Sequence, residues 1–234
     1  MMVRQALALT LMLISAPVLS GPAEPEAHDP EDPQQTLQGY MRAAELGHAE
    51  SMNRIGVLYA QGVVVAQDYV AALAWYERAA KRGSYAALEN IATLYFYGLG
   101  VPQSYVESAR ILELAVRGGG ADAQNKLGSL YDGGIGVERD SRRAFDLFRQ
   151  AAEQGYPPAL ANLGRLYCEG RGVERNDLRG YALIRAAVEA GLPDAMVDEA
   201  NRSLSKAATR LGTAHLARAQ AMASAIVAAF SKTD

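Results

Sequence analysis

The chain has 234 residues, of which 50% are hydrophobic and 21% are charged, and its formal net charge is −3. Surfaces that bind nucleic acid typically have a high pI and clustered Lys and Arg, so this balance argues against a nucleic-acid partner. The single cysteine excludes an internal disulfide framework and a zinc site built from cysteines. Three histidines leave little for a histidine-metal centre. We therefore expect no metal and no cofactor.

Residues 1–20 have the features of a secretory signal peptide. Arg4 gives a short positive region, and the apolar run after it is shorter than the roughly 20 residues of a membrane span. Val18 and Ser20 are small enough for a cleavage site before Gly21. We expect a cleaved signal peptide and a periplasmic or secreted protein with no membrane span after its removal. An uncleaved signal anchor is the alternative interpretation.

Residues 21–35 are rich in prolines and acidic side chains. Such a segment cannot bury enough apolar surface to fold, so it is predicted to be a disordered leader that acts as a spacer.

A period of 36 residues runs through the rest of the chain, with glycine at positions 47, 83, 119, 155 and 191. Tyrosine, glycine, valine and alanine recur at fixed offsets from these glycines, with no insertion between units. The period divides the chain into an N-terminal half-repeat, four repeats and C-terminal capping helices. Their ranges are 36–46, 47–82, 83–118, 119–154, 155–190 and 191–234.

Each unit is predicted to fold into two helices. The first, helix A, carries apolar residues at i, i+3, i+6 and i+7, which is one face of a helix. The second, helix B, follows a residue type that favours the N-cap position, and the period glycine suits the left-handed backbone that ends a helix. The four N-cap residues are Asp68, Ser104, Asp140 and Asn176.

One small residue interrupts the apolar stripe of every helix A. Glycine inside a helix costs about 1 kcal/mol relative to alanine, so its recurrence predicts that the neighbouring helix approaches closely at this point. The four residues are Gly56, Ala92, Gly128 and Gly164.

The two ends depart from the pattern. Residues 36–46 match helix B of an incomplete leading unit. After the fourth repeat, Glu199 and Ser203 stand where each helix A has Ile or Leu and Tyr, and polar residues at core positions should stop the stacking. Thr213 can cap a last helix, 214–230. Since one helix pair cannot bury its apolar face alone, we expect an all-α, right-handed α-solenoid of stacked helix pairs.

The unit resembles the Sel-1-like repeat, a relative of the tetratricopeptide repeat. The third unit carries the family pattern through Leu127-Gly128, Leu130-Tyr131, Gly134, Gly136-Val137 and Asp140, and it closes with Ala151-Ala152-Glu153-Gln154-Gly155. The resemblance covers residues 47–191 fully and 36–46 in part. It implies an exported adaptor that holds other proteins, and a closing helix at Thr213–Phe230 like that of bacterial members.

Three features resemble motifs of nucleotide-binding sites or enzymes: the G-x-G loops, the single cysteine and a Ser-x-x-Lys string. The G-x-G loops that join helix A to helix B lack the preceding strand of a dinucleotide-binding fingerprint. Cys168, predicted to be semi-exposed on the concave side, has no histidine in its unit to activate it, although an intermolecular disulfide remains open.

Ser203-Leu204-Ser205-Lys206 has the Ser-x-x-Lys spacing of a β-lactamase nucleophile without its Ser-Asp-Asn and Lys-Thr-Gly partners. A cysteine-rich branch of the family is associated with penicillin binding or β-lactamase activity, but this chain lacks the disulfides of that branch. We therefore expect no catalytic residues.

By analogy with tetratricopeptide repeats, the helix A residues beside the apolar stripe should line a concave surface that binds a protein or peptide. Asparagines there could bond the backbone of an extended peptide, and aromatic residues could act as anchors. The predicted binding residues are Asn53, Val57, Glu89, Thr93, Phe96, Tyr97, Asn125, Ser129, Asp132 and Arg165.

The sequence thus predicts a non-catalytic, exported adaptor for protein–protein interaction. Two roles compete within this class: a regulator of an envelope component, and an immunity protein that neutralises an effector targeted to the periplasm. The alternative from another class is a β-lactamase-like or cell-wall enzyme.

Overall fold

The computed structural model describes residues 33–230. The predicted signal peptide (1–20) and residues 21–32 of the predicted leader lie outside this range. Within it, all regular secondary structure is helical, as predicted. The described residues form two compact units, residues 33–123 and residues 124–230. The first two repeats lie in residues 33–123, and most of the third and all of the fourth lie in residues 124–230.

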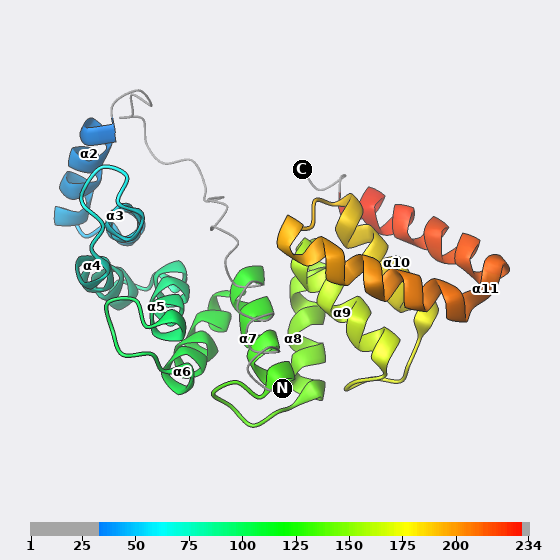
Figure 1. Ribbon diagram of the computed structural model, residues 1–234. Coiled ribbons are helices and arrows are strands. Elements are labelled where there is room, and N and C mark those ends of the chain that lie inside the picture. Colours follow the sequence, from blue (N-terminus) through cyan, green and yellow to red (C-terminus); the bar gives the residue numbers. More distant parts are fainter. Residues whose placement is uncertain (1–32, 231–234) are drawn as a thin grey trace. The chain divides into compact units, whose positions relative to one another are not determined.

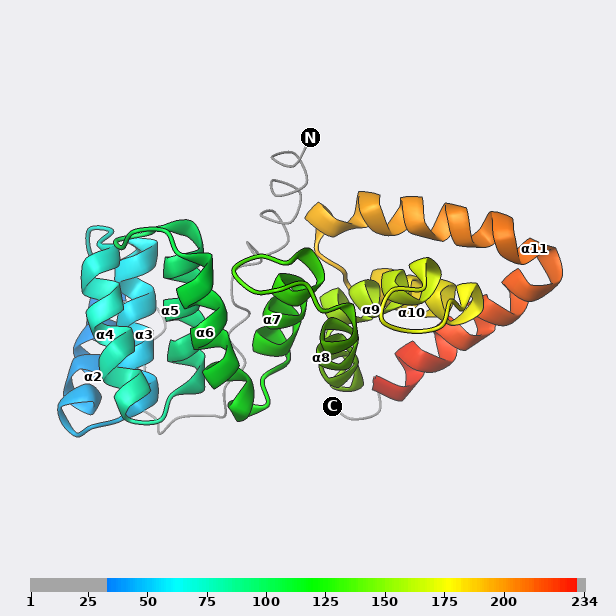
Figure 2. The ribbon, with the colours of Figure 1, turned by 90° about the horizontal axis from the view of Figure 1, so that it is seen from below.

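The N-terminal unit is a row of helices, each packed on the next (Figures 1 and 2). The half-repeat α2 (Pro33–Glu45) precedes the pairs α3 (Ala49–Gln61) with α4 (Tyr69–Lys81) and α5 (Tyr85–Tyr97) with α6 (Tyr105–Ala115). A short 3-10 helix η1 (Val116–Gly118) follows α6. Since α2 begins at Pro33, the prediction of disorder through residue 35 is wrong for its last three residues; proline is favoured in the first turn of a helix.

The C-terminal unit contains the third and fourth helix pairs and the closing helix. The pairs are α7 (Ala121–Gly133), whose first residues belong to the N-terminal unit, with α8 (Ser141–Glu153), and α9 (Pro157–Glu169) with α10 (Asp177–Glu189). The closing helix α11 (Asp194–Phe230) bends at Gly212, where φ is 69° and ψ is 173°. Figure 2 shows its two arms, residues 194–211 and 213–230, diverging from this bend.

The predicted helix boundaries of the repeats are confirmed. The side chain of each of the four predicted helix B N-caps accepts a hydrogen bond from a backbone N–H in the first turn of its helix. That of Asp68, for example, lies 2.9 Å from the nitrogens of Val70 and Ala71. The period glycines have φ between 76° and 91°. Residues with a Cβ rarely adopt this backbone, which explains why glycine recurs there.

The small residues of helix A mark a close approach of the two helices in a pair, as predicted. A Cβ added to Gly56 would lie 2.5 Å from the ring of Tyr76, and one added to Gly128 would lie 2.8 Å from the ring of Phe148. In the second repeat, the equivalent residues are Ala92 and Leu112, both buried. In the fourth repeat, a Cβ added to Gly164 would lie 2.7 Å from both Ile184 and the carbonyl oxygen of Gly180.

The two arms of α11 pack against α10. On the first arm, four residues are buried, and on the second, Ala219 and Ala223 are buried. Ala223 belongs to one apolar cluster with Ala182 and Ala186 of α10, against which Met222, Ile226 and Val227 also pack. The buried residues of the first arm are Met196, Ala200, Leu204 and Ala207. Leu216, Met222, Ile226 and Phe230 of the second arm are half-buried.

An ion pair fixes the first arm of α11 to the start of α10. Nε of Arg210 lies 3.0 Å from both carboxylate oxygens of Asp177, and Nη2 of Arg175 lies 2.8 Å from one of them. Desolvation raises the pKa of Asp177, but the hydrogen bonds from Arg210 and Arg175 outweigh it and lower this pKa below its ordinary value. The ion pair therefore stabilises the fold above the ordinary pKa of aspartate, and this contribution is lost as the pH falls through the lowered value.

Replacing Gly128 by alanine should destabilise the protein, although alanine is the better helix former. The added methyl group must displace the ring of Phe148, and such overpacking costs about 1–3 kcal/mol, more than the roughly 1 kcal/mol gained in helix propensity. Urea unfolding of G128A should show a lower midpoint.

The control is the double variant Gly128→Ala with Phe148→Leu, which copies the Ala92 and Leu112 pair of the second repeat. The double variant should lose less free energy of unfolding than the sum of the losses in the two single variants. A more stable Gly128→Ala variant, or strict additivity, would show that the contact between helix and ring does not set the packing distance.

Candidate protein-binding surface

In the N-terminal unit, the predicted binding residues divide into buried and half-buried sets. Asn53, Val57 and Phe96 are buried, with 4%, 6% and 5% of their surface exposed. The half-buried residues are Glu89, Thr93 and Tyr97. The prediction that Asn53, Val57 and Phe96 line a free surface is therefore wrong.

Contacts within the unit explain this burial. Oδ1 of Asn53 accepts a hydrogen bond from Nδ2 of Asn90 at 2.9 Å, which links helix A of one repeat to helix A of the next. The Phe96 ring packs against the rings of Tyr97 and Tyr105, with both pairs of centroids 5.0 Å apart. Burial, followed by the nearby Tyr105, raises the pKa of Tyr97 to about 12, so its hydroxyl stays protonated at neutral pH.

The C-terminal unit repeats this arrangement. Asn125, Ser129 and Asp132 are buried, which also contradicts their predicted exposure, and Arg165 is half-buried. Nδ2 of Asn162 donates to Oδ1 of Asn125 at 2.9 Å. Both units thus contain an Asn–Asn hydrogen bond between residues 37 positions apart.

Asn90 and Asn162 were not among the predicted binding residues, because each lies one position beyond the helix A positions assigned to the binding surface. Their signal was the repetition of asparagine at the same place in alternate units: 90 and 162 are separated by two periods, as are 53 and 125.

Asp132 is the centre of a partly buried ion cluster. Nη2 of Arg165 lies 2.9 Å from Oδ2 of Asp132, and Nη1 of Arg171 lies 2.8 Å from Oδ1. Nε of Arg171 lies 2.7 Å from Glu169, whereas Arg165 lies 3.6 Å from Glu169 and 3.7 Å from Glu199. Two guanidinium groups therefore compensate the charge of the buried Asp132, and this cluster joins α7, α9 and α11.

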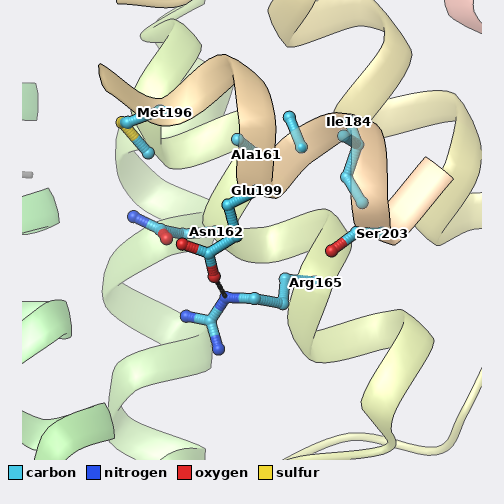
Figure 3. A pocket seen from close by; sticks show the side chains of 8 residues that line it. Ala161, Asn162, Arg165, Ile184, Met196, Glu199 and Ser203 are labelled. Carbon is cyan, nitrogen blue, oxygen red and sulfur yellow. Dashed lines mark ion pairs between the residues drawn. The ribbon is translucent and has the colours of Figure 1, made fainter. Parts of the chain in front are cut away.

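An open pocket of about 250 Å³ lies beside this cluster, between α9, α10 and the first arm of α11 (Figure 3). Its apolar part comes from Ala161, Ile184, Met196 and Ala200, and its polar part from Asn162, Arg165, Glu199 and Ser203. Figure 3 shows Glu199 on α11 pointing toward Arg165 on α9. Arg165 is thus the one predicted binding residue that lines this pocket.

The Ser-x-x-Lys string does not place both of its chemical groups in the pocket. Ser203 lines it, but Lys206 is exposed and is not among the residues that line it.

The G-x-G loops have a structural explanation. A Cβ on Gly100 would lie 2.8 Å from Tyr69, and one on Gly172 would lie 2.1 Å from the carbonyl oxygen of Ser141. Each of these loops therefore packs on the start of helix B in the preceding repeat, where there is no room for a side chain.

Cys168 is buried, with 7% of its surface exposed, so the prediction of a semi-exposed position is wrong. A Cβ on Gly180 of α10 would lie 2.3 Å from Sγ of Cys168, which shows that the thiol fills the space that the glycine leaves. Desolvation, with a smaller contribution from Asp177, raises the pKa of Cys168 to about 11. The thiol is therefore protonated at neutral pH and packs as a small apolar side chain.

Across residues 33–230, no helix has the length and apolarity needed to cross a membrane.

Comparison with protein families matches the model of the Sel1 repeat four times, at residues 49–84, 86–120, 121–156 and 157–192. Comparison with curated proteins gives no significant match.

Similar solved structures have the same repeat fold. A protective antigen present in uropathogenic Escherichia coli strains is 25% identical, with a TM-score of 0.77 over 87% of this chain and 43% of the antigen. This chain therefore spans less than half of the antigen's length. A Sel1 repeat protein from Oxalobacter formigenes is 28% identical, with a TM-score of 0.62 over 69% of this chain and 67% of that one. An immunity protein from Pseudomonas aeruginosa, 20% identical with a TM-score of 0.52 over 97% of this chain and 81% of its own, is similar in fold.

Replacing Asp132 by asparagine should destabilise the protein by about 1–3 kcal/mol, because Arg165 and Arg171 would lose their shared buried counter-charge. The matched control is Asp146→Asn, since Asp146 forms only exposed ion pairs of 3.7–3.8 Å with Arg142 and Arg149, and it should change stability by less than about 0.5 kcal/mol. Urea unfolding of both variants measures the difference. Equal effects would mean that the Asp132 cluster has no special role in stability.

Cys168 should react slowly with a soluble thiol reagent in the folded protein. Raising its pKa from 9.0 to about 11 lowers the thiolate fraction at pH 8 about a hundredfold, and burial further limits access. The reaction rate in native buffer should rise by at least this factor in denaturant. Rapid labelling of the native protein, or a dimer on a non-reducing gel, would contradict the buried, protonated thiol.

Proposed function

Because this chain belongs to the Sel1 repeat family, we propose that it is an exported, non-catalytic adaptor that binds another protein or a peptide through the helix A surfaces of its repeats. Sel1 repeat proteins are generally scaffolds for protein interaction. Repeats suit this role because each one adds a similar patch of helix surface that need not contribute to the core.

The pocket of the C-terminal unit is the observation that carries this proposal. It combines an apolar base with four polar side chains, which is the composition of a recognition site. The pocket is shallow and open to solvent, so it cannot enclose a whole small molecule as cavities of roughly 300–1,000 Å³ do. Such a pocket suits contact with one side chain of a larger partner.

The half-buried residues of helix A in the N-terminal unit offer a second patch. Thr93 and Tyr97 lie one turn apart on α5 and retain accessible surface, while Phe96 supports Tyr97 from below through an edge-to-face contact. A tyrosine held in this way can contribute contact area at little entropic cost, because its ring is already ordered.

The alternative enzymatic function is less well supported. The Ser-Asp-Asn and Lys-Thr-Gly partners of a Ser-x-x-Lys nucleophile do not occur in the sequence, and Lys206 does not line the pocket that contains Ser203. Hydrolysis of a chromogenic β-lactam by the purified protein, abolished by Ser203→Ala, would nevertheless overturn the adaptor proposal.

Export is the part of the proposal that depends on residues 1–20. The positive region, apolar run and small residues before Gly21 support a cleaved signal peptide. Mass spectrometry of the protein from the envelope fraction should find an N-terminal peptide that begins at or near Gly21. A protein that retains Met1 in the cytosolic fraction would contradict export.

Two specific roles fit an exported adaptor: a regulator that masks an envelope component, and an immunity protein. The likeness to the Pseudomonas aeruginosa immunity protein, at 20% identity, concerns the fold and does not choose between them. The neighbouring genes would discriminate, because a sensor kinase favours the regulator and an effector favours immunity.

Site-specific photocrosslinking tests the binding surface in living cells. A photoreactive amino acid replaces Thr93 or Ser203, which lie on the proposed surface, or Arg149 or Arg185, which are exposed on helix B. The first two positions should capture a partner that mass spectrometry can identify, and the last two should not. Equal capture from all four positions, or capture from helix B alone, would show that neither the helix A surface nor the pocket is the binding site.

A further inference from the structure

The pocket of the C-terminal unit also has a charge that points to the chemistry of its ligand. Three carboxylates, from Asp132, Glu169 and Glu199, surround two guanidinium groups, from Arg165 and Arg171. The cluster therefore has one negative charge in excess.

The excess charge is held mainly by Glu199. Asp132 and Glu169 each have an arginine nitrogen within 2.9 Å, whereas the carboxylate of Glu199 lies 3.7 Å from Nε of Arg165, beyond hydrogen-bond distance. The side chain of Glu199 is 37% exposed. Figure 3 shows this carboxylate at the polar end of the pocket. Glu199 is thus the acceptor in the cluster that can take a further donor.

The repeat register shows that Glu199 is a departure from the pattern. The equivalent residues of the four helix A segments are apolar: Ile55, Ile91, Leu127 and Leu163. A carboxylate at such a position costs free energy unless a partner compensates its charge, and the compensation that Arg165 supplies at 3.7 Å is weak.

The rest of the pocket is lined by apolar side chains. Met196 and Ala200 lie on the same arm of α11 as Glu199, and Ile184 lies on α10. Lysine and arginine bury their methylene groups against apolar surface while their charged ends reach a polar site. An apolar base with a carboxylate at its end complements the polarity and charge of such a side chain.

We propose that this pocket binds a lysine or arginine side chain of the protein partner. The stem lies against Ile184, Met196 and Ala200, and the cationic end donates to Glu199. This inference rests on the proposed adaptor function and names the chemistry that its partner presents. Because the contact is ionic, binding weakens as the salt concentration rises.

A titration with a single blocked amino acid tests the pocket without any partner. N-acetyl-lysine methylamide is added to the isotope-labelled protein, and N-acetyl-norleucine methylamide serves as the uncharged probe of similar length. Amide signals of Ser203 and Asn162 should shift, with the lysine probe binding about tenfold more tightly, the effect of a hydrogen bond between charged groups. Equal binding of the two probes, or no shift at these residues, would overturn the proposal.

Three variants make the result specific. Glu199→Gln keeps the size of the side chain and should abolish the preference for lysine. Glu199→Ile restores the repeat residue, so it should fold normally and lose lysine binding as well. The control Glu153→Gln removes one exposed carboxylate of α8, which pairs with Arg149 away from the pocket, and should leave the preference unchanged. Retention of the preference in Glu199→Gln would also overturn the proposal.

Selection from a library of displayed peptides separates this inference from the proposed function. Enrichment of peptides with a lysine or arginine that is lost in Glu199→Gln supports both. Enriched peptides that lack a basic residue and ignore Glu199→Gln would retain the adaptor function and overturn the pocket's specificity. No crosslinked partner in cells, together with lysine binding in the titration, would overturn the adaptor function while the pocket's chemistry stands.

Discussion

The distance between helix A and helix B within each repeat is the constraint on which the rest of the structure depends. It is set where a small residue of helix A meets helix B, as at Gly56 under the ring of Tyr76 and Gly128 under that of Phe148. A glycine inside a helix is unfavourable in isolation, so the contact with the ring must offset its cost. The equivalent positions hold Ala92 and Leu112 in the second repeat and Gly164 and Ile184 in the fourth. Each repeat thus places a small residue of helix A at the same point of the register, and helix A of one repeat can meet helix A of the next.

This register decides which helix A residues remain available for binding. Positions that tetratricopeptide analogy assigns to a ligand surface are here used to join repeats: Asn53 and Asn125 each accept a hydrogen bond from an asparagine of the following helix A. A buried amide without a partner would cost about 1–3 kcal/mol, so these bonds make the register specific. The surface left for a partner is therefore smaller and more localised than one residue set per repeat would suggest.

The features that the sequence predicted are those that depend on local backbone chemistry or on the period. N-caps such as Asp68 and the period glycines act within a few residues of their own positions, and a 36-residue repetition reveals both. The burial of Asn53 and Cys168 depends instead on which side chain of another helix lies opposite, Asn90 in one case and Gly180 in the other. A single repeat unit carries no information about that pairing. Periodicity thus predicts helices and their stacking, but the exposure of individual side chains follows from contacts between repeats.

The end of the helix row in the C-terminal unit shows how one change in sequence can serve both fold and recognition. In a continuing row, helix A would present Ile or Leu at the position of Glu199 and Tyr at that of Ser203, so that another helix could cover them. The first arm of α11 instead buries Met196, Ala200, Leu204 and Ala207, and this leaves Glu199 and Ser203 at the edge of the contact with α9. Polar side chains there remove the apolar surface that a further repeat would need. The second arm of α11 packs on α10 through Ala219 and Ala223 and does not cover Glu199 and Ser203. The same substitutions therefore leave an open pocket that contains the weakly compensated carboxylate of Glu199. Ending the repeat row and creating a site for a cationic side chain are, in physical terms, consequences of the same two residues.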